Sequence, residues 1–120
     1  MPRPVKCRRV CALPRMTAFH PESIQTGKEP VVLTVDEYET IRIIDWNGAS
    51  QEACGHSMQV ARATVQQIYL SARRKLAAAL VEGRPIQIQG GTYRLCDGRR
   101  GCNGCRCLEH TLAEQQEDSI

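Results

Sequence analysis

The stretch from Val60 to Glu82 places the strongest constraint on what this chain can fold into. Apolar residues recur there at intervals of three and four, which predicts one long helix that buries a single face. The members of this apolar stripe are Val65, Ile68, Ala72, Leu76, Ala79 and Leu80. The helix is expected to run from about Arg62 to Glu82, because Gly83 and Pro85 end helices. Its first turns present side chains of the kinds that contact phosphates and base edges, namely Arg62, Thr64, Gln66 and Gln67.

A first helix is expected from residue 34 onward. Thr34 and Glu37 have the spacing of a capping box, and Leu33 can pack on Tyr38 across the helix start. Gly48 is suited to the left-handed conformation that terminates helices. The apolar stripe of this helix is predicted to be Tyr38, Ile41, Ile44 and Trp46.

A second, shorter helix is capped by Ser50 and extends to about Ser57, with Cys54 and Met58 facing inward. A turn at residues 58–60 then leads into the long helix. A short helix, a tight turn and a longer helix with a polar beginning form the geometry that lays a helix in the major groove of DNA. An ordinary three-helix core without a ligand is the alternative interpretation.

The segments outside residues 32–83 are expected to be extended or irregular. Residues 1–15 are basic and contain prolines, which favours an extended arm or an edge strand. Residues 16–31 form a connection in which Met16 and Phe19 are predicted to anchor on the core. Residues 84–95 are predicted to form a small β-hairpin, because two alternating segments flank Gly90 and Gly91.

The net charge of +3 is distributed unevenly over the 120 residues. The segments 1–15 and 84–107 are strongly basic, whereas residues 16–83 are slightly acidic and the tail 108–120 has acids but no Lys or Arg. Two basic segments on either side of a near-neutral helical centre are typical of a nucleic-acid-binding surface. Solvated surface charge is the alternative. The basic residues of the arm that we expect to contact DNA are Arg3, Lys6, Arg8 and Arg9.

The motifs within residues 33–80 resemble region four of bacterial sigma factors. They comprise Leu33-Thr34, the run from Asn47 to Glu52, Val60-x-Arg62-x-Thr64-Val65, and Ala72 to Leu76. Residues 1–95 as a whole are similar to uncharacterised protein family 0251, a group of small prokaryotic predicted DNA-binding proteins. The segments that carry this second resemblance are Met1 to Val10, Leu33 to Glu37, Ser50 to Glu52 and Gly90-Gly91. The sigma resemblance implies that Arg62 contacts DNA and that Gln67 faces the groove, with Thr64 and Gln66 at positions that can also face DNA.

Three positions depart from the sigma-like pattern. The turn residue that is usually Gly is Gln59, and the usual Ser or Thr cap of the recognition helix is Ala61. Gln59 is expected to destabilise the turn by about 1 kcal/mol if this residue has to be left-handed. Ala61 is expected to cost about 1 kcal/mol of stability through the missing cap. Gly55 replaces a customary Ala in the second helix and lowers helix propensity by about the same amount. The sequence therefore predicts a motif that is less rigid than the family pattern.

The chain has 7 cysteines, and four of them fall within twelve residues. These four are Cys96, Cys102, Cys105 and Cys107, in a segment of Gly, Arg and Asp that offers no apolar core. Tetrathiolate zinc is one interpretation, since Cys102 and Cys105 have the spacing of a zinc knuckle. An iron–sulfur cluster is another, because Cys102 to Cys107 resembles the cluster-binding loop of redox regulators in the mercury-resistance-regulator family. Thiols without a metal are the third.

The other three cysteines have different predicted roles. Cys54 is expected to be a small buried residue of the core. Cys7 and Cys11 are possible additional ligands, if the arm pairs with the strand region 86–95. No segment has the length of a membrane span and the N-terminus lacks an apolar signal stretch, so we expect a cytoplasmic, reducing location.

The expected fold is mainly α: a three-helix helix-turn-helix core with a small β-hairpin and a Cys-rich C-terminal loop. The expected units are an arm and connection at 1–31, the helical unit at 32–83, the hairpin at 84–95, a metal site at 96–107 and an acidic flexible tail at 108–120. The expected function is a DNA-binding transcriptional regulator that carries zinc or an iron–sulfur cluster. An accessory protein that handles metal or clusters, with the helices as scaffold, is the alternative. Double-stranded DNA is the expected partner, with a homodimer through the back of residues 70–82 as an option. No arrangement of catalytic residues indicates an enzyme.

Overall fold

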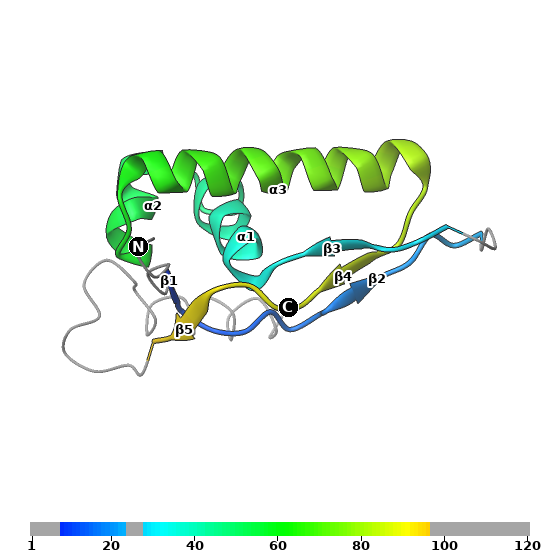
Figure 1. Cartoon of the computed structure of the whole chain (residues 1–120), viewed down its shortest axis with the longest axis horizontal. Helices are drawn as coiled ribbons and strands as arrows, with labels where there is room; N and C mark the ends of the chain where they lie inside the picture. Colours follow the sequence, from blue (N-terminus) through cyan, green and yellow to red (C-terminus); the bar gives the residue numbers. More distant parts are fainter. Residues whose placement is uncertain (1–7, 24–27, 97–120) are drawn as a thin grey trace, which may run out of the picture.

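The computed structural model describes residues 8–23 and 28–96. Figure 1 shows the long helix α3 lying across two small sheets, with the other helices beneath its first half. The helical elements are α1 (Val35–Thr40), its π-helical continuation η1 (Ile41–Trp46), α2 (Gln51–Met58) and α3 (Arg62–Glu82). The strands are β1 (Arg8–Val10), β2 (Ala18–Phe19), β3 (Val31–Leu33), β4 (Ile86–Ile88) and β5 (Tyr93–Leu95). The described part of the chain is therefore mainly α with small sheets, as expected.

Helix α1 begins as the sequence predicts. The Thr34 amide donates to Glu37 Oε1 at 2.9 Å, and the Glu37 amide donates to Thr34 Oγ1 at 3.3 Å. Burial by itself raises the pKa of Glu37. Hydrogen bonds from Lys75, Ser71 and the Thr34 amide outweigh that effect, so the pKa lies below its ordinary value. Through Lys75 and Ser71, the capping residue of α1 also binds α3.

The predicted apolar stripe of the first helix is wrong at its end. Trp46 is 67% exposed, whereas Ile43 is buried. The reason is the π-helical geometry of η1, in which the Asn47 amide donates to the Arg42 carbonyl five residues back. Because a π-helix has more residues per turn than an α-helix, the residues that face the core differ from those predicted with 3.6 residues per turn. Gly48 then ends this helical segment with φ +79°, as expected.

Helices α2 and α3 have nearly the predicted bounds. Ser50 Oγ accepts from the Ala53 amide, while Cys54 and Met58 are fully buried. Helix α3 ends at Gly83, which has a left-handed conformation with φ +66°. The prediction for Leu80 is wrong, because this side chain is 81% exposed. Among the described helices, α1 and α2 lie beneath the first half of α3 (Figure 1), whereas Leu80 belongs to its last turn.

The predicted β-hairpin at 84–95 is wrong, because its two strands belong to different sheets. Strand β4 pairs in parallel with β3 and antiparallel with β2, while β5 pairs in parallel with β1. Gly90 and Gly91 have positive φ but do not reverse the chain into a hairpin. They carry the chain past the start of α1, where the Val35 amide donates to the Gly90 carbonyl at 3.0 Å. A Cβ at Gly91 would lie 2.8 Å from Thr34 Cβ, so this close approach requires glycine.

The N-terminal arm forms an edge strand at β1, as the basic, proline-containing sequence indicated. Its register with β5 pairs Arg8 with Tyr93 and Val10 with Leu95. The anchors predicted for the connection are wrong, since Met16 and Phe19 are both more than half exposed. Phe19 lies in the two-residue strand β2, which is at the edge of its sheet and leaves this side chain toward solvent.

The interior has two clusters, one under each part of α3. The first joins the strands to α1 and α3 through Val10, Leu33, Val35, Ala72 and Ile88. The second joins η1, α2 and α3 through Ile43, Cys54, Met58 and Val65. In the described segments, no helix combines the length and hydrophobicity that a membrane crossing requires.

A buried ion pair links the arm to the helices. Glu39 is fully buried and accepts from Arg42 Nε and Nη2, each at 2.8 Å. The same carboxylate accepts from the Cys11 amide at 3.0 Å, directly after β1. Three hydrogen bonds therefore satisfy a charge that burial would otherwise make very costly.

We predict that Glu39→Gln destabilises the protein by about 3 kcal/mol, because it removes the buried carboxylate charge that pairs with the Arg42 guanidinium. Urea unfolding followed by circular dichroism measures the change. The control is Glu52→Gln on the exposed surface of α2, which should alter stability by less than about 0.5 kcal/mol. Equal effects of the two substitutions would contradict the assigned role of Glu39.

A second prediction concerns Gly55 in α2. A Cβ at this position would lie 2.8 Å from the Val60 carbonyl oxygen, which is backbone and cannot rotate away. We expect Gly55→Ala to lower stability by about 1–3 kcal/mol, although Ala has a helix propensity about 1 kcal/mol better than Gly. Ala53→Gly, at an exposed position of the same helix, reports the propensity effect alone. A Gly55→Ala variant that is more stable than the wild type would show that the turn yields freely.

Candidate nucleic-acid interface

The turn between α2 and α3 has the left-handed conformation at residue 59, which is less favourable for Gln than for Gly. Gln59 is left-handed, with φ 60° and ψ 44°, and is the one non-glycine residue with positive φ in the described structure. The Val60 amide donates to the Gly55 carbonyl at 3.0 Å and the Gln59 amide donates to the His56 carbonyl at 3.3 Å. These two bonds form a Schellman motif that satisfies the last carbonyls of α2. Because Gly55 has no Cβ, the Val60 carbonyl can approach α2 closely after the turn.

The beginning of α3 carries no side-chain cap. Ala61 is the N-cap residue, and no acidic side chain lies in the first turn. The first amides of a helix have no partner within the helix, and the helix dipole makes this end attractive to anions. In the part of the chain that the structure describes, the start of α3 thus has the electrostatic character that an anionic ligand would favour.

The four α3 residues predicted to contact DNA lie on the first turns of α3, away from the buried stripe. Arg62, Gln66 and Gln67 are exposed, and Thr64 is half-buried. Val65 and Ile68 point into the core from the same turns, which fixes the orientation of the exposed set. Further along the helix, the Arg73 guanidinium stacks over the Tyr69 ring at 5.4 Å from its centroid.

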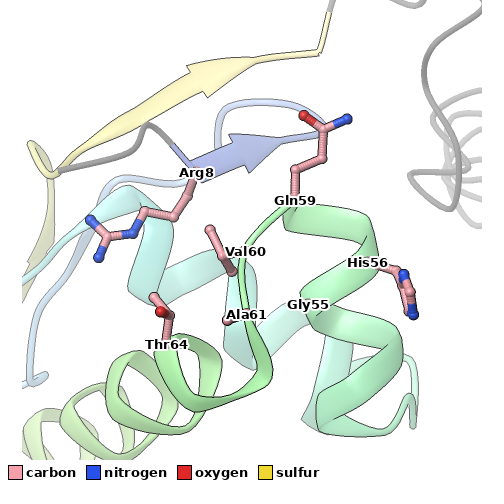
Figure 2. A pocket seen from close by; sticks show the side chains of 7 residues that line it. All are labelled: Arg8, Gly55, His56, Gln59, Val60, Ala61 and Thr64. Atoms are coloured by element: carbon pink, nitrogen blue, oxygen red, sulfur yellow. The ribbon is translucent and has the colours of Figure 1, made fainter. Parts of the chain in front are cut away.

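A pocket of about 690 Å³ lies beside this helix start, between the α2–α3 turn and β1. Figure 2 shows the Arg8 and Thr64 side chains at one side of it, and the Val60 side chain directed from the turn toward β1. Gln59 extends upward toward the strands and His56 points away. The residues that line the pocket are Arg8, Gly55, His56, Gln59, Val60, Ala61 and Thr64, none of them acidic.

The basic residues of the arm that were predicted to contact DNA differ in where the structure places them. Arg8 lines the pocket, and one of its terminal nitrogens lies 3.8 Å from Asp36 Oδ2. Arg9 is 4% exposed, so its side chain is not presented on the surface that α3 and the pocket form. The sequence does not distinguish the two neighbours, because alternation along a three-residue strand cannot show which side chain is covered. Arg3 and Lys6 lie outside the described residues.

The cysteine predictions fall partly within the described structure. The Cys96 amide donates to the Val10 carbonyl at 2.7 Å, so Cys96 and Cys11 directly follow the paired residues Leu95 and Val10. This pairing is the condition under which Cys11 was expected to approach the Cys-rich segment. Cys11 is disulfide-bonded. Cys7, Cys102, Cys105 and Cys107 lie outside the described residues.

No group of three or more metal-ligand side chains occurs within residues 8–23 and 28–96. Cys54 is buried in the helical core, as predicted. Burial and then the negative charge of Glu39 raise the pKa of this thiol to about 12, so it is a poor metal ligand.

One basic residue of this surface, Arg94, was not predicted from the sequence to belong to it. Arg94 of β5 donates a hydrogen bond from its guanidinium to Gln59 Oε1 in the turn. The expected hairpin would have placed β5 against β4. Because β5 pairs with β1 instead, Arg94 reaches the turn that precedes α3. The only signal in the sequence was the basic character of residues 84–107.

Comparison with known proteins identifies relatives. Residues 1–96 match a family model described as protein of unknown function DUF134. A UPF0251 protein of Desulfitobacterium hafniense is 56% identical over 106 residues, covering 88% of this chain and 83% of the relative. UPF0251 proteins of Ruminiclostridium cellulolyticum and Thermoanaerobacter pseudethanolicus are 44% and 45% identical and cover 85% and 88% of this chain, with 79% and 92% of their own lengths matched. No solved structure matches the chain. The chain therefore belongs to the UPF0251 family and carries the DUF134 region over residues 1–96.

Proposed function

We propose that this protein binds double-stranded DNA as a transcriptional regulator, with α2, the turn and α3 acting as a helix-turn-helix. In this proposal the first turns of α3 enter the major groove. The observation that carries it is the arrangement of α3 itself: Arg62, Gln66 and Gln67 are exposed at an uncapped, acid-free helix start, while Val65 and Ile68 anchor the same turns in the core. The resemblance to region four of sigma factors agrees with this orientation.

The side chains would have different tasks in such a complex. Arg62 can bind guanine O6 and N7 with two hydrogen bonds, and Gln66 or Gln67 can bind adenine N6 and N7. Thr64 is half-buried beside the pocket and is better placed for a phosphate than for a base edge. Arg73 stacks on Tyr69 more than two turns after the helix start, so it is not expected to read bases.

We further propose that the Cys-rich end holds a zinc ion or an iron–sulfur cluster through Cys96, Cys102, Cys105 and Cys107. The pairing of β1 with β5 supports a contribution from Cys11 as well, because it brings the two strand ends that precede Cys11 and Cys96 together. Metal binding requires thiolates, so Cys11 could serve as a ligand only in the reduced protein.

The DNA proposal predicts a salt-sensitive complex. Each neutralised phosphate contributes a slope of about −0.9 to the plot of log K against log salt concentration. If the protein contacts several phosphates, raising the salt from low to physiological concentration should therefore weaken binding steeply. Arg62→Ala is expected to lower affinity for a selected duplex by about 10- to 100-fold and to relax base preference at one position. Fluorescence anisotropy, after selection of a binding sequence from a random duplex pool, measures both effects.

Arg74→Ala is the matched control, since Arg74 is an exposed residue of α3 three turns further along. It should retain the base preference of the wild type. If Arg62→Ala and Arg74→Ala behave identically, α3 does not read DNA as proposed. If the wild type forms no salt-sensitive complex with any duplex, the proposed function itself is wrong.

The metal proposal predicts that protein purified anaerobically with a reductant contains either zinc or iron with acid-labile sulfide. Elemental analysis and visible absorbance distinguish the two. A Cys96→Ser variant should lose most of the bound metal, whereas Cys54→Ser should retain it, because Cys54 is buried in the helical core. Metal-free protein, or equal metal content in both variants, would contradict the proposal. Iron–sulfur protein that binds no DNA would favour the accessory-protein function.

A further inference from the structure

The outer side of α3 presents several apolar side chains at helical spacing. Leu70, Leu80 and Val81 are 54%, 81% and 86% exposed, and Ala77 between them is exposed as well. Residues three, four and seven apart share one side of a helix. No described element covers this side of α3 (Figure 1). Single exposed apolar residues are normal, whereas a set gathered on one helix face is typical of a protein–protein contact.

The residues on either side of Ala77 have opposite characters. Leu80 and Val81 follow Ala77 by three and four positions, while Arg73 and Arg74 precede it by the same numbers, and all four are exposed. If an antiparallel copy of α3 crossed at Ala77, the apolar pair of each helix would therefore meet the arginine pair of the other. The methylene stems of arginine cover apolar surface well. The small side chain of Ala77 allows the two helices to approach closely.

The charges of α3 also favour an antiparallel copy. The last turn of the helix contains no basic residue, and the helix dipole makes this end negative. The Glu82 carboxylate pairs with Arg84 at 3.1 Å, but 54% of its side chain is still exposed. An antiparallel copy brings Arg73 and Arg74 to this negative end. A parallel copy would instead set the arginine pairs against each other, which is unfavourable.

A groove at the end of α3 offers a place for Leu70 of a second copy. It has a volume of about 260 Å³, and Phe19, Leu80, Arg84 and Ile86 are among its lining residues. Leu70 precedes Ala77 by seven positions and Arg84 follows it by seven. Antiparallel helices that cross at Ala77 therefore bring Leu70 of each copy opposite the groove of the other.

We propose that the outer side of α3 binds a second copy of this chain, with the two α3 helices antiparallel and crossing at Ala77. Each copy contributes the same residues, so the contact has two-fold symmetry and the assembly closes as a dimer. The homodimer that the sequence left as an option thus acquires a defined interface. This interface is inferred from α3 itself and does not require DNA binding.

The dimer has a consequence on DNA, and this step rests on the proposed function. The first turns of α3 precede Ala77 by about 13 residues, or roughly 20 Å of helix, so the two helix starts lie roughly 40 Å apart. In dimeric helix-turn-helix proteins the half-sites lie about 34–36 Å apart, which is one turn of DNA. The proposed dimer would therefore present its two helix starts at a separation close to one turn of the duplex.

The first test is sedimentation velocity of the full chain over a series of concentrations, in which the wild type should form a reversible dimer. Ala77→Glu and Ala77→Lys should each raise the dimer dissociation constant by at least roughly tenfold, because residue 77 meets its own copy and a charge of either sign repels itself. Ala63→Glu is the matched control. Ala63 is an exposed residue of the same helix, but it lies beyond the overlap of the two copies, so the dimer should be unchanged.

An exchange of charges tests the antiparallel direction. Arg74→Glu should weaken the dimer, because it places an acid near Glu82 of the second copy. The double variant Arg74→Glu with Glu82→Arg should recover most of the affinity, since the same two positions then attract each other with their signs exchanged. A double variant that associates no better than Arg74→Glu would show that the helices are not arranged as proposed.

A wild type that stays monomeric at every concentration overturns the inference. A dimer that both Ala77 variants leave intact also overturns it, and a dimer linked only by cysteines would behave in this way. Circular dichroism of each variant verifies that the comparison is made on folded protein. Monomeric protein that forms the salt-sensitive DNA complex would refute the dimer alone, whereas a dimer that binds no duplex would refute the proposed function alone.

Discussion

The carboxylate of Glu39 is the interaction on which the arrangement of the strands and helices depends. It is fully buried, and its hydrogen bonds come from Arg42 in η1 and from the Cys11 amide just after β1. An ion of this kind tolerates few alternative geometries, because displacement of either donor leaves a buried charge unsatisfied. It therefore fixes the end of β1 against the first helix. From that position β1 reaches both α2 and β5, which brings the arm beside the turn before α3.

Features that depend on neighbours in the chain could be predicted from the sequence. The Thr34–Glu37 capping box, the Ser50 cap and the glycine at the end of α3 each involve residues within a few positions of one another. Strand partners depend instead on contacts between distant segments. The alternating residues of β4 fit a neighbour on either side, and nothing local indicated that β3 would take the place of β5. Similarly, a period of 3.6 residues could not show that η1 widens and turns Trp46 outward.

The same distinction explains which parts of the candidate interface could be foreseen. Periodicity assigns Val65 and Ile68 to the core, so it also assigns Arg62, Gln66 and Gln67 to the outer surface of α3. The approach of Arg94 to Gln59 depends on the β1–β5 pairing, which the sequence left as one possibility among others. The burial of Arg9 could not be read from a strand of three residues. Basic composition indicated that positive charge would surround the helical centre. It could not indicate which guanidinium groups would converge on one turn.

The turn itself shows how departures from a family pattern can be compensated. A left-handed Gln59 costs about 1 kcal/mol relative to glycine, and Ala61 provides no cap. Glycine at position 59 could not accept a hydrogen bond from Arg94, however, and a side-chain cap would occupy amides that an anion could use. Gly55 admits the close return of the Val60 carbonyl, and the Schellman bonds satisfy the end of α2. Of the three changes, Gln59 therefore links the turn to the β1–β5 strand pair through Arg94, in addition to the backbone bonds of the turn itself. Any event that separates these strands would therefore loosen the turn and remove basic side chains from the same surface.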